Sequence, residues 1–272
     1  MRITWVTDPH LDFVTKEQRD DFVALVAKEE PDALFLTGDI GRSLIIVNCL
    51  ERFARGLRCP TYFVLGNHDY YGSSIAKVRQ QMKKLCAQSG KLFWLPEAGV
   101  IELTPEVCLL GHGGWGDGLA GNAQKSPIIL NDWHYIEELA IIDEKERLAR
   151  LAALGQEAAD HLQKHIQQAI TRYKQIIVLM HVPPFREACW HNGEISDDDW
   201  APHFTNEAAG KVLLAAAREN PHVAFTVFCG HTHSDGVARM AKNLLVNTGD
   251  AIYRAPAVQE TFTLPGKGVR PT

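Results

Sequence analysis

The sequence predicts an α/β fold, and two observations carry that prediction. Short apolar runs rich in β-branched and aromatic residues, such as 33–37 and 61–65, alternate with longer stretches of helical periodicity, such as 144–173. Strands that alternate with helices along a chain are typical of α/β proteins. The chain has 272 residues, 46% of them hydrophobic, which is enough for a sizeable core. We therefore expect one domain over residues 1–272.

The first third of the chain is predicted to contain three strands and three helices. The strands are the apolar runs 2–7, 33–37 and 61–65. The helices are expected at 15–29, 43–54 and 73–89. Thr15 and Ser73 or Ser74 are residues of the N-cap type, whereas Pro31 and Gly56 are residues that end helices.

The rest of the chain continues the pattern with shorter strands. Strands are expected at 91–95, 99–103, 107–110, 176–180 and 225–229, followed by antiparallel strands at 237–240, 244–246 and 261–264. Helices are expected at 132–140, 144–173 and 206–219. The segments 111–118, rich in glycine, and 185–204 are predicted to be irregular, and the tail from Pro265 to be frayed.

Composition narrows the class of protein. The formal net charge of −5 provides no global attraction for nucleic acid or for anionic membranes. No apolar run approaches the roughly 20 residues that span a bilayer, and the first strand begins at Arg2, which leaves no room for a signal peptide. The six cysteines contain no Cys-x-x-Cys pair and are expected to be buried thiols. We expect a soluble protein of the cytoplasm.

Polar side chains follow five of the predicted strands at the point where each strand ends. These residues are Asp8 and His10, Asp39, Asn67 with His68 and Asp69, His181, and His231 with His233. Because the carboxyl ends of strands are where α/β sheets form their sites, we expect these side chains to lie close together. A cluster of buried polar groups without partners would be costly, so the pattern favours a functional site over satisfied polar residues of the core.

The types of these residues indicate metal binding. One divalent ion needs about four to six ligands, so a set of this size suits two ions better than one. Imidazoles, carboxylates and one amide, without a thiolate, favour Mn, Fe, Zn, Co or Ni over Ca. Two such ions roughly 3.5–4 Å apart can act on the attacking and leaving oxygens of a phosphoryl displacement. The sequence therefore predicts two divalent transition-metal ions as cofactors.

The five motifs, in this order, resemble those of the calcineurin-like metallophosphoesterase superfamily, and they span residues 8–233. The resemblance implies a four-layer αββα sandwich of two mixed sheets flanked by helices, here with a helical insert. It implies that the first metal is held by Asp8, His10 and His233, that Asp39 bridges, and that the second is held by Asn67, His181 and His231. It also implies that His68 acts on the phosphate, stabilising it or protonating the leaving oxygen, and that Asp69 orients His68.

The activity that this resemblance implies is hydrolysis of a phosphoester by a metal-bound hydroxide. The segment Gly38–Arg42 departs from the Gly-Asp-x-Val-Asp-Arg-Gly motif of protein Ser/Thr phosphatases, and Asp69 stands where they have Glu. The acidic balance of the chain counts against a nuclease. A non-catalytic scaffold that binds a protein is disfavoured because every ligand and His68 are present. We expect a small-molecule phosphodiester or phosphomonoester as substrate; nothing in the pattern indicates an oligomeric state.

Substrate specificity is expected from the segments that cover the metals. The candidates are the loop and insert at 111–140, which contain His112 and Trp115, and the loop 185–204. These segments are equally compatible with an ordinary surface loop, in which Trp115 anchors the loop on the insert helix. Arg42 either reaches the substrate phosphate or is a surface arginine.

Overall fold

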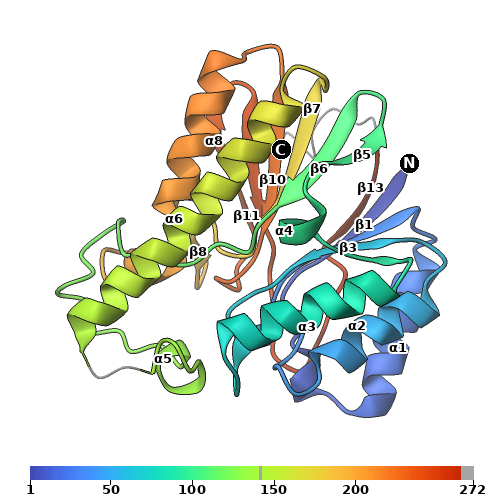
Figure 1. Cartoon of the computed structure of the whole chain (residues 1–272), viewed down its shortest axis with the longest axis horizontal. Helices are drawn as coiled ribbons and strands as arrows, with labels where there is room; N and C mark the ends of the chain where they lie inside the picture. Colours follow the sequence, from blue (N-terminus) through green and yellow to red (C-terminus); the bar gives the residue numbers. More distant parts are fainter. Residues whose placement is uncertain (141–142, 265–272) are drawn as a thin grey trace.

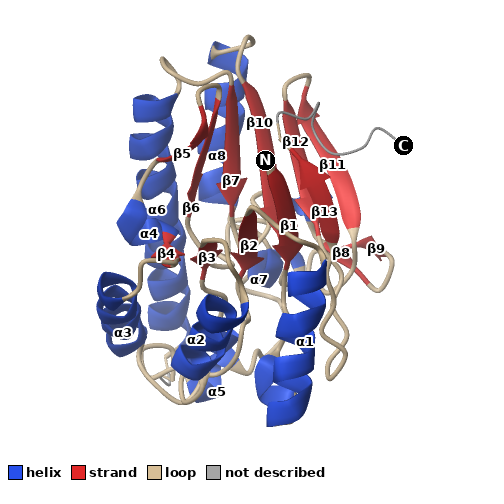
Figure 2. Ribbon diagram, turned by 90° about the vertical axis from the view of Figure 1, so that its right-hand side faces the viewer, coloured by secondary structure: helices blue, strands red, loops and turns tan. Residues whose placement is uncertain are grey.

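The computed structural model describes residues 1–140 and 143–264. Two β-sheets pack face to face, and helices cover the outer face of each (Figure 1). The turned view in Figure 2 shows the strands of both sheets between the helices. The predicted four-layer α/β sandwich of two mixed sheets is confirmed.

The first sheet has the strand order β13-β1-β2-β3-β4. Its parallel strands are β1 (Arg2–Val6), β2 (Ala33–Thr37), β3 (Thr61–Val64) and β4 (Leu92–Trp94). The antiparallel strand β13 (Glu260–Thr263) pairs with β1, so the end of the described chain returns to its beginning. The parallel strands β1, β2 and β3 end immediately before three of the predicted polar motifs.

The second sheet has the order β11-β12-β10-β7-β6-β5. Its strands are β5 (Ile101–Thr104), β6 (Val107–Gly111), β7 (Gln175–Leu179), β10 (Ala224–Cys229), β11 (Gly236–Ala241) and β12 (Leu244–Thr248). The four inner strands are parallel. The expectation of three antiparallel strands at the end of the chain is therefore partly wrong: β12 is antiparallel to β11 but parallel to β10, and β13 joins the other sheet.

Three apolar layers hold the sandwich together. Phe35, Leu179 and Phe228 belong to the layer between the two sheets. The helices α1 (Lys16–Lys28), α2 (Ile46–Gly56) and α3 (Ile75–Gln88) cover the first sheet, and α6 (Glu144–Ala169) and α8 (Glu207–Glu219) cover the second. Thr15 caps α1 in a capping box with Gln18, and Ser74 caps α3, as the sequence predicts.

Three predicted helices have clearly different bounds in the structure. The helix expected at 43–54 begins at Ile46, because the Ser43 hydroxyl donates to the Tyr71 carbonyl at 2.7 Å and so belongs to the preceding turn. The helix expected at 132–140 is a single turn, α5 (Asp132–Tyr135). It ends there because the next residue, Ile136, forms a β-bridge with Ser73. The long helix also ends at Ala169, earlier than expected.

Several short elements complete the described chain. The 3₁₀ turns are η1 (Leu11–Phe13), η2 (His68–Tyr70) and η3 (Arg186–Ala188), and the other short elements are α4 (Leu95–Ala98), α7 (Ala201–Phe204) and the hairpin of β8 (Trp190–His191) and β9 (Glu194–Ile195). The glycine-rich segment after Gly111 is a loop, as predicted. The predicted frayed tail from Pro265 lies outside the described residues. Across the described ranges, no helix combines the length and apolarity that crossing a membrane requires.

Candidate metal centre

The backbone is in the left-handed region at most of the predicted ligands. Five of them have positive φ angles: Asp8 (45°), His10 (42°), Asp39 (49°), His231 (71°) and His233 (59°). Positive φ is uncommon for residues other than glycine, and clusters of it occur at functional sites. Left-handed backbone at Asp8 and His10, and not extended strand, therefore directs both side chains to the site.

Two glycines allow the strand ends to approach one another. A Cβ atom on Gly66 would lie 2.1 Å from Asp39 Oδ1. A Cβ atom on Gly230 would lie 1.9 Å from Asp8 Oδ2. Because both contacts are far shorter than any van der Waals contact, a side chain at either position would displace a carboxylate of the site.

The first group of candidate ligands comprises Asp8, His10, Asp39 and His233, whose ligand atoms all lie within 4.8 Å of one another. His10 Nε2 is 3.1 Å from His233 Nε2 and 3.7 Å from Asp39 Oδ2. His233 Nε2 is 3.5 Å from Asp8 Oδ1. The side chains of His10, Asp8 and Asp39 are almost fully buried. The structure thus brings together all four residues that the sequence assigns to the first metal, including the bridging aspartate.

The second group forms on the other side of Asp39. Asn67 Oδ1 lies 3.1 Å from His181 Nε2 and 3.1 Å from His231 Nδ1, and these two ring nitrogens are 3.2 Å apart. Asp39 Oδ1 lies 3.4 Å from His181 Nε2. Asp39 therefore presents Oδ2 to the first group and Oδ1 to the second, which is the arrangement expected of a bridging carboxylate.

Hydrogen bonds to backbone carbonyls set the tautomers of two histidines. His181 Nδ1 donates to the Thr37 carbonyl at 2.9 Å, and His231 Nε2 donates to the His203 carbonyl at 3.2 Å. In neutral rings the nitrogens that face Asn67 Oδ1 are then lone-pair acceptors. Three acceptor atoms that converge within hydrogen-bond distance repel one another unless a cation lies between them. This donor set fits a divalent metal.

The electrostatics of the group agree with this fit. Burial lowers the pKa of His10 to about 3 and that of His231 to about 3, so both rings are in the neutral form that binds metals. Burial, followed by the nearby carboxylates of Asp8 and Asp69, raises the pKa of Asp39 well above its ordinary value. A divalent cation between the groups would favour ionised Asp39 and remove the cost of burying the carboxylates.

Asp132 supports the second group and was not predicted as a site residue. Its Oδ1 accepts hydrogen bonds from Asn67 Nδ2 at 2.7 Å and from the Tyr71 hydroxyl at 2.5 Å, and the side chain is buried. The first contact fixes the orientation of the Asn67 amide so that its oxygen faces His181 and His231. In the sequence, Asp132 is one acidic residue at the start of a predicted helix, and no local signal connects it with Asn67.

His68 and Asp69 do not form the predicted pair. His68 lies outside both ligand groups; its ring stacks on Tyr71 with centroids 4.3 Å apart, and burial lowers its pKa to about 2. The Asp69 carboxylate accepts backbone hydrogen bonds from Gly41 at 2.9 Å and Gly66 at 2.8 Å. Over the described chain no hydrogen bond joins Asp69 to His68, whose Nδ1 is buried without a partner. Asp69 instead ties together the two loops that carry Asp39 and Asn67.

The three predicted substrate residues fall into two classes. Arg42 is half exposed and forms an ion pair with Asp12 at 3.1 Å. His112 is buried, and its Nδ1 accepts from the Gly114 amide at 3.1 Å. Trp115 is only 4% exposed, and its ring lies 5.6 Å from that of Tyr70. The geometry favours the anchoring interpretation for Trp115 and leaves His112 no surface on which to meet a substrate.

The comparisons with known proteins agree with this geometry. The model of the calcineurin-like phosphoesterase family matches residues 1–235. The chain belongs to this family. Calcineurin-like phosphoesterases are hydrolases that typically bind two metals, and the resemblance inferred from the motifs is confirmed. Among curated proteins, none matches the chain by sequence.

Solved structures share the calcineurin-like phosphoesterase fold with this chain. A phosphopantetheinyl hydrolase from Mycobacterium tuberculosis has a TM-score of 0.71 at 14% identity, with coverage of 99% of this chain and 98% of that one. A dimetal phosphatase from Danio rerio has a TM-score of 0.60 at 12% identity, with coverage of 96% and 91%. A protein of Thermus thermophilus has a TM-score of 0.55 at 14% identity, with coverage of 92% and 88%. Identities this low show a common fold alone.

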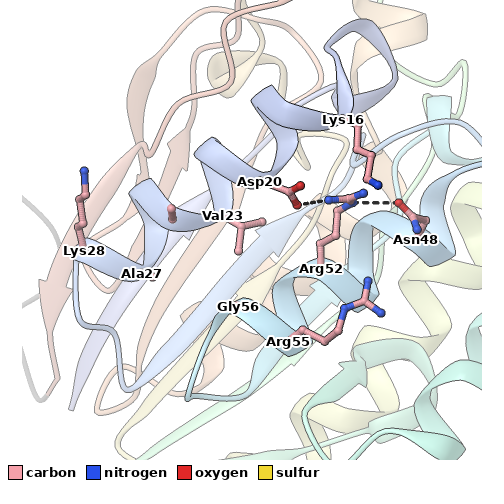
Figure 3. A pocket seen from close by; sticks show the side chains of 10 residues that line it. Lys16, Asp20, Val23, Ala27, Lys28, Asn48, Arg52, Arg55 and Gly56 are labelled. Carbon is pink, nitrogen blue, oxygen red and sulfur yellow. Dashed lines mark hydrogen bonds and ion pairs between the residues drawn. The ribbon is translucent and has the colours of Figure 1, made fainter.

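A separate groove of about 800 Å³ lies between α1 and α2, outside the calcineurin-like metal centre (Figure 3). Lys16, Lys28, Arg52 and Arg55 line it together with Asp20. Figure 3 shows Arg52 between Asp20, with which it forms an ion pair, and Asn48, to which its Nε donates at 2.9 Å. Because its most buried cation is already paired, this groove has no evident chemistry of its own.

Proposed function

We propose that the protein is a metal-dependent hydrolase of small-molecule phosphodiesters or phosphomonoesters. The single observation that carries the proposal is the position of Asp39, whose two carboxylate oxygens face two different groups of donors. The cofactors would be two divalent transition-metal ions drawn from Mn, Fe, Zn, Co and Ni.

The residues that would hold each ion follow from the two groups. Asp8, His10, His233 and Asp39 Oδ2 would hold the first ion, and Asn67, His181, His231 and Asp39 Oδ1 the second. When bound, the ions would activate water and neutralise charge on the phosphoryl oxygens. The role of the chain would be to orient these ligands: the carbonyls of Thr37 and His203 hold two of the imidazole rings, and the carboxylate of Asp132 holds the Asn67 amide.

We propose that His68 is a catalytic side chain that acts on the substrate and does not bind a metal. Its ring lies 4.8 Å from that of His10, next to the first group, and Tyr71 stacks behind it. From this position the neutral imidazole would donate a hydrogen bond to a phosphoryl oxygen, and it would protonate the leaving oxygen only once the charge of a bound phosphate had raised its pKa. We propose that Asp69 acts indirectly. Its carboxylate accepts hydrogen bonds from the Gly41 and Gly66 amides and so holds the loops that carry Asp39 and Asn67.

We propose a small molecule as the substrate because of what surrounds the centre. Residues 111–140 contribute the buried Asp132 and the half-exposed Tyr135 beside it, and so would form one wall of the substrate site. Arg42, which the sequence analysis considered for substrate contact, is half exposed, and its guanidinium lies over Tyr71 and Tyr135. The acidic balance of the chain supports neither nucleic acid nor membrane as partner, and we propose the cytoplasm as its compartment.

The test combines metal content with a substrate panel. The full-length protein is stripped with a chelator, reloaded with each of the five metals, and assayed with an aryl phosphomonoester, an aryl phosphodiester, a cyclic nucleotide and a phosphoprotein. We add a phosphopantetheinyl phosphodiester because a structurally similar protein is a phosphopantetheinyl hydrolase. We expect two ions per chain, a rise in melting temperature on loading, and hydrolysis of at least one small ester. Two bound ions without hydrolysis of any ester would contradict the proposal and favour a scaffold.

A further inference from the structure

Beside the first ligand group lies a loop that the sequence analysis did not single out. The loop lies between β12 and β13, and Gln259 joins its two ends. Gln259 Oε1 accepts from the Asp250 amide at 2.9 Å, and Gln259 Nε2 donates to the Asp250 carbonyl at 2.9 Å. At the tip, the ring of Tyr253 lies 4.5 Å from that of His10 and 5.1 Å from that of His233. Tyr253 is nevertheless 45% exposed. Its ring therefore has one side on the first ligand group and an open side toward solvent.

Other aromatic side chains follow Tyr253 in a chain of contacts beside the two ligand groups. Phe13 lies 4.9 Å from Tyr253, and the guanidinium of Arg42 lies 5.6 Å from Phe13 and 5.8 Å from Tyr135. Tyr135 is 48% exposed and lies 5.4 Å from Tyr71, the residue that stacks on His68. We call this set, made of Phe13, Arg42, Tyr71, Tyr135 and Tyr253, the aromatic arc. It runs from the first ligand group to His68, so it borders the place where a phosphoryl group would be held.

The chemistry of the aromatic arc suits one kind of ligand. Half-exposed tyrosine rings offer π faces on which planar rings stack, and this stacking tolerates different ring types. Arg42 has five N–H donors, and within residues 1–140 and 143–264 its one ion-pair partner is Asp12, so donors remain for a second anionic or polar group. An aliphatic ligand would gain little from rings on which a cation also lies. The aromatic arc thus offers ring faces for stacking and a positive charge, both next to the candidate metal ligands.

We propose that the aromatic arc binds the organic part of the substrate and that this part carries a planar aromatic ring, as in a nucleotide. The proposal rests on the phosphoesterase function proposed above, and it adds the class of substrate. Tyr253 is the residue expected to stack directly on the ring, because it is the exposed tyrosine closest to His10 and His233. Tyr135 and Arg42 would meet the ring or its substituents from the side of His68.

The experiment measures binding and needs no turnover. Dissociation constants of the phosphonate analogues of adenosine 5′-monophosphate and ribose 5-phosphate, in which a P–C bond replaces the hydrolysable ester bond, are measured by calorimetry on the Mn²⁺-loaded full chain. The two ligands share the phosphonate and the sugar and differ in the aromatic base. If the arc stacks on the base, the nucleotide should bind about 5- to 150-fold more tightly, the range expected for one stacked base. Tyr253→Ala should reduce this ratio to near one, whereas Tyr253→Phe should keep most of it.

The outcomes separate this inference from the proposed function. If neither ligand binds the loaded protein, the phosphoesterase proposal itself fails. If both bind equally in the wild type, the site holds phosphate but the aromatic arc does not select a ring, and the inference is overturned. It is also overturned if the ratio is unchanged in both Tyr253→Ala and Tyr135→Ala. Leu25→Ala, at a half-exposed apolar residue of α1, is the control and should leave the ratio and the melting temperature as in the wild type.

Discussion

Replacing Asp132 should weaken the second ligand group and spare the first. In Asp132→Ala, Asn67 Nδ2 loses its 2.7 Å hydrogen bond and keeps only a 3.4 Å contact with the Tyr71 hydroxyl. The amide is then free to turn its nitrogen toward His181 and His231. A hydrogen bond to a charged group contributes about 1.5–3 kcal/mol. If this energy holds the amide in its binding orientation, the affinity of the second ion should fall about 10- to 100-fold, as for other residues that orient metal ligands.

The assay for this prediction is a titration that resolves two binding events. Calorimetry of the chelator-stripped protein with Mn²⁺ or Zn²⁺ should show one affinity unchanged and one weakened in Asp132→Ala. Asp132→Asn keeps an acceptor oxygen and should lose less affinity for the second ion. Tyr71→Phe leaves the hydrogen bond between Asp132 and Asn67 in place and should lose less affinity still. Two unchanged affinities would refute the reasoning, and so would an equal loss of both, since the latter indicates general destabilisation.

The remaining predictions concern single residues of the site. Asp39→Asn should remove far more metal and activity than loss of any peripheral ligand, because it alone faces both groups; elemental analysis that finds a full pair of metals would exclude bridging. His68→Ala should keep metal and fold while turnover falls about 10²–10⁴-fold, and a variant without metal would make His68 a ligand. Asp69→Asn should lower the melting temperature, since the backbone amides of two loops depend on it; an unchanged melting temperature with lowered turnover would restore its predicted role behind His68. Trp115→Ala should cost about 3–5 kcal/mol of stability and reduce activity equally for large and small esters, and a loss confined to large esters would place Trp115 in the substrate pocket after all.

The sequence was sufficient to predict the strands of the two large sheets and the polar residues at their ends, but not the short hairpin of β8 and β9. Each strand that carries a ligand is a short apolar run with glycine or proline near it, so its limits are local properties of the chain. That Asp8, Asp39 and His181 would meet follows from a general property of α/β sheets, in which sites form at the carboxyl ends of strands. A cluster of these side chains could therefore be predicted without coordinates, whereas its division into two ligand groups came from the resemblance to the family's motifs.

What the sequence could not supply were contacts between distant segments that have no periodic pattern. Asp132 and Asn67 are 65 positions apart, and the helix expected around Asp132 is cut short by a bridge to Ser73 that only the folded chain reveals. Tyr253 belongs to a loop between two strands of different sheets, and the crossing of β13 to the first sheet is not encoded in local polarity. The hydrogen bonds of Asp69 could not be predicted for the same reason, because the backbone amides that donate to its carboxylate have no signature in the sequence.

The two ligand groups draw their members from both sheets. Asp8, Asp39 and Asn67 follow strands of the first sheet, whereas His181, His231 and His233 follow strands of the second. Two bound metal ions would therefore cross-link the sheets. The first ion would join His10 to His233, which are 223 positions apart. Closing so long a segment restricts the unfolded chain strongly, so an ion that remained bound during unfolding would work like a staple across nearly the whole protein. Separation of the two sheets would then require release of the metals first, and chelators should speed unfolding as well as lower the melting temperature.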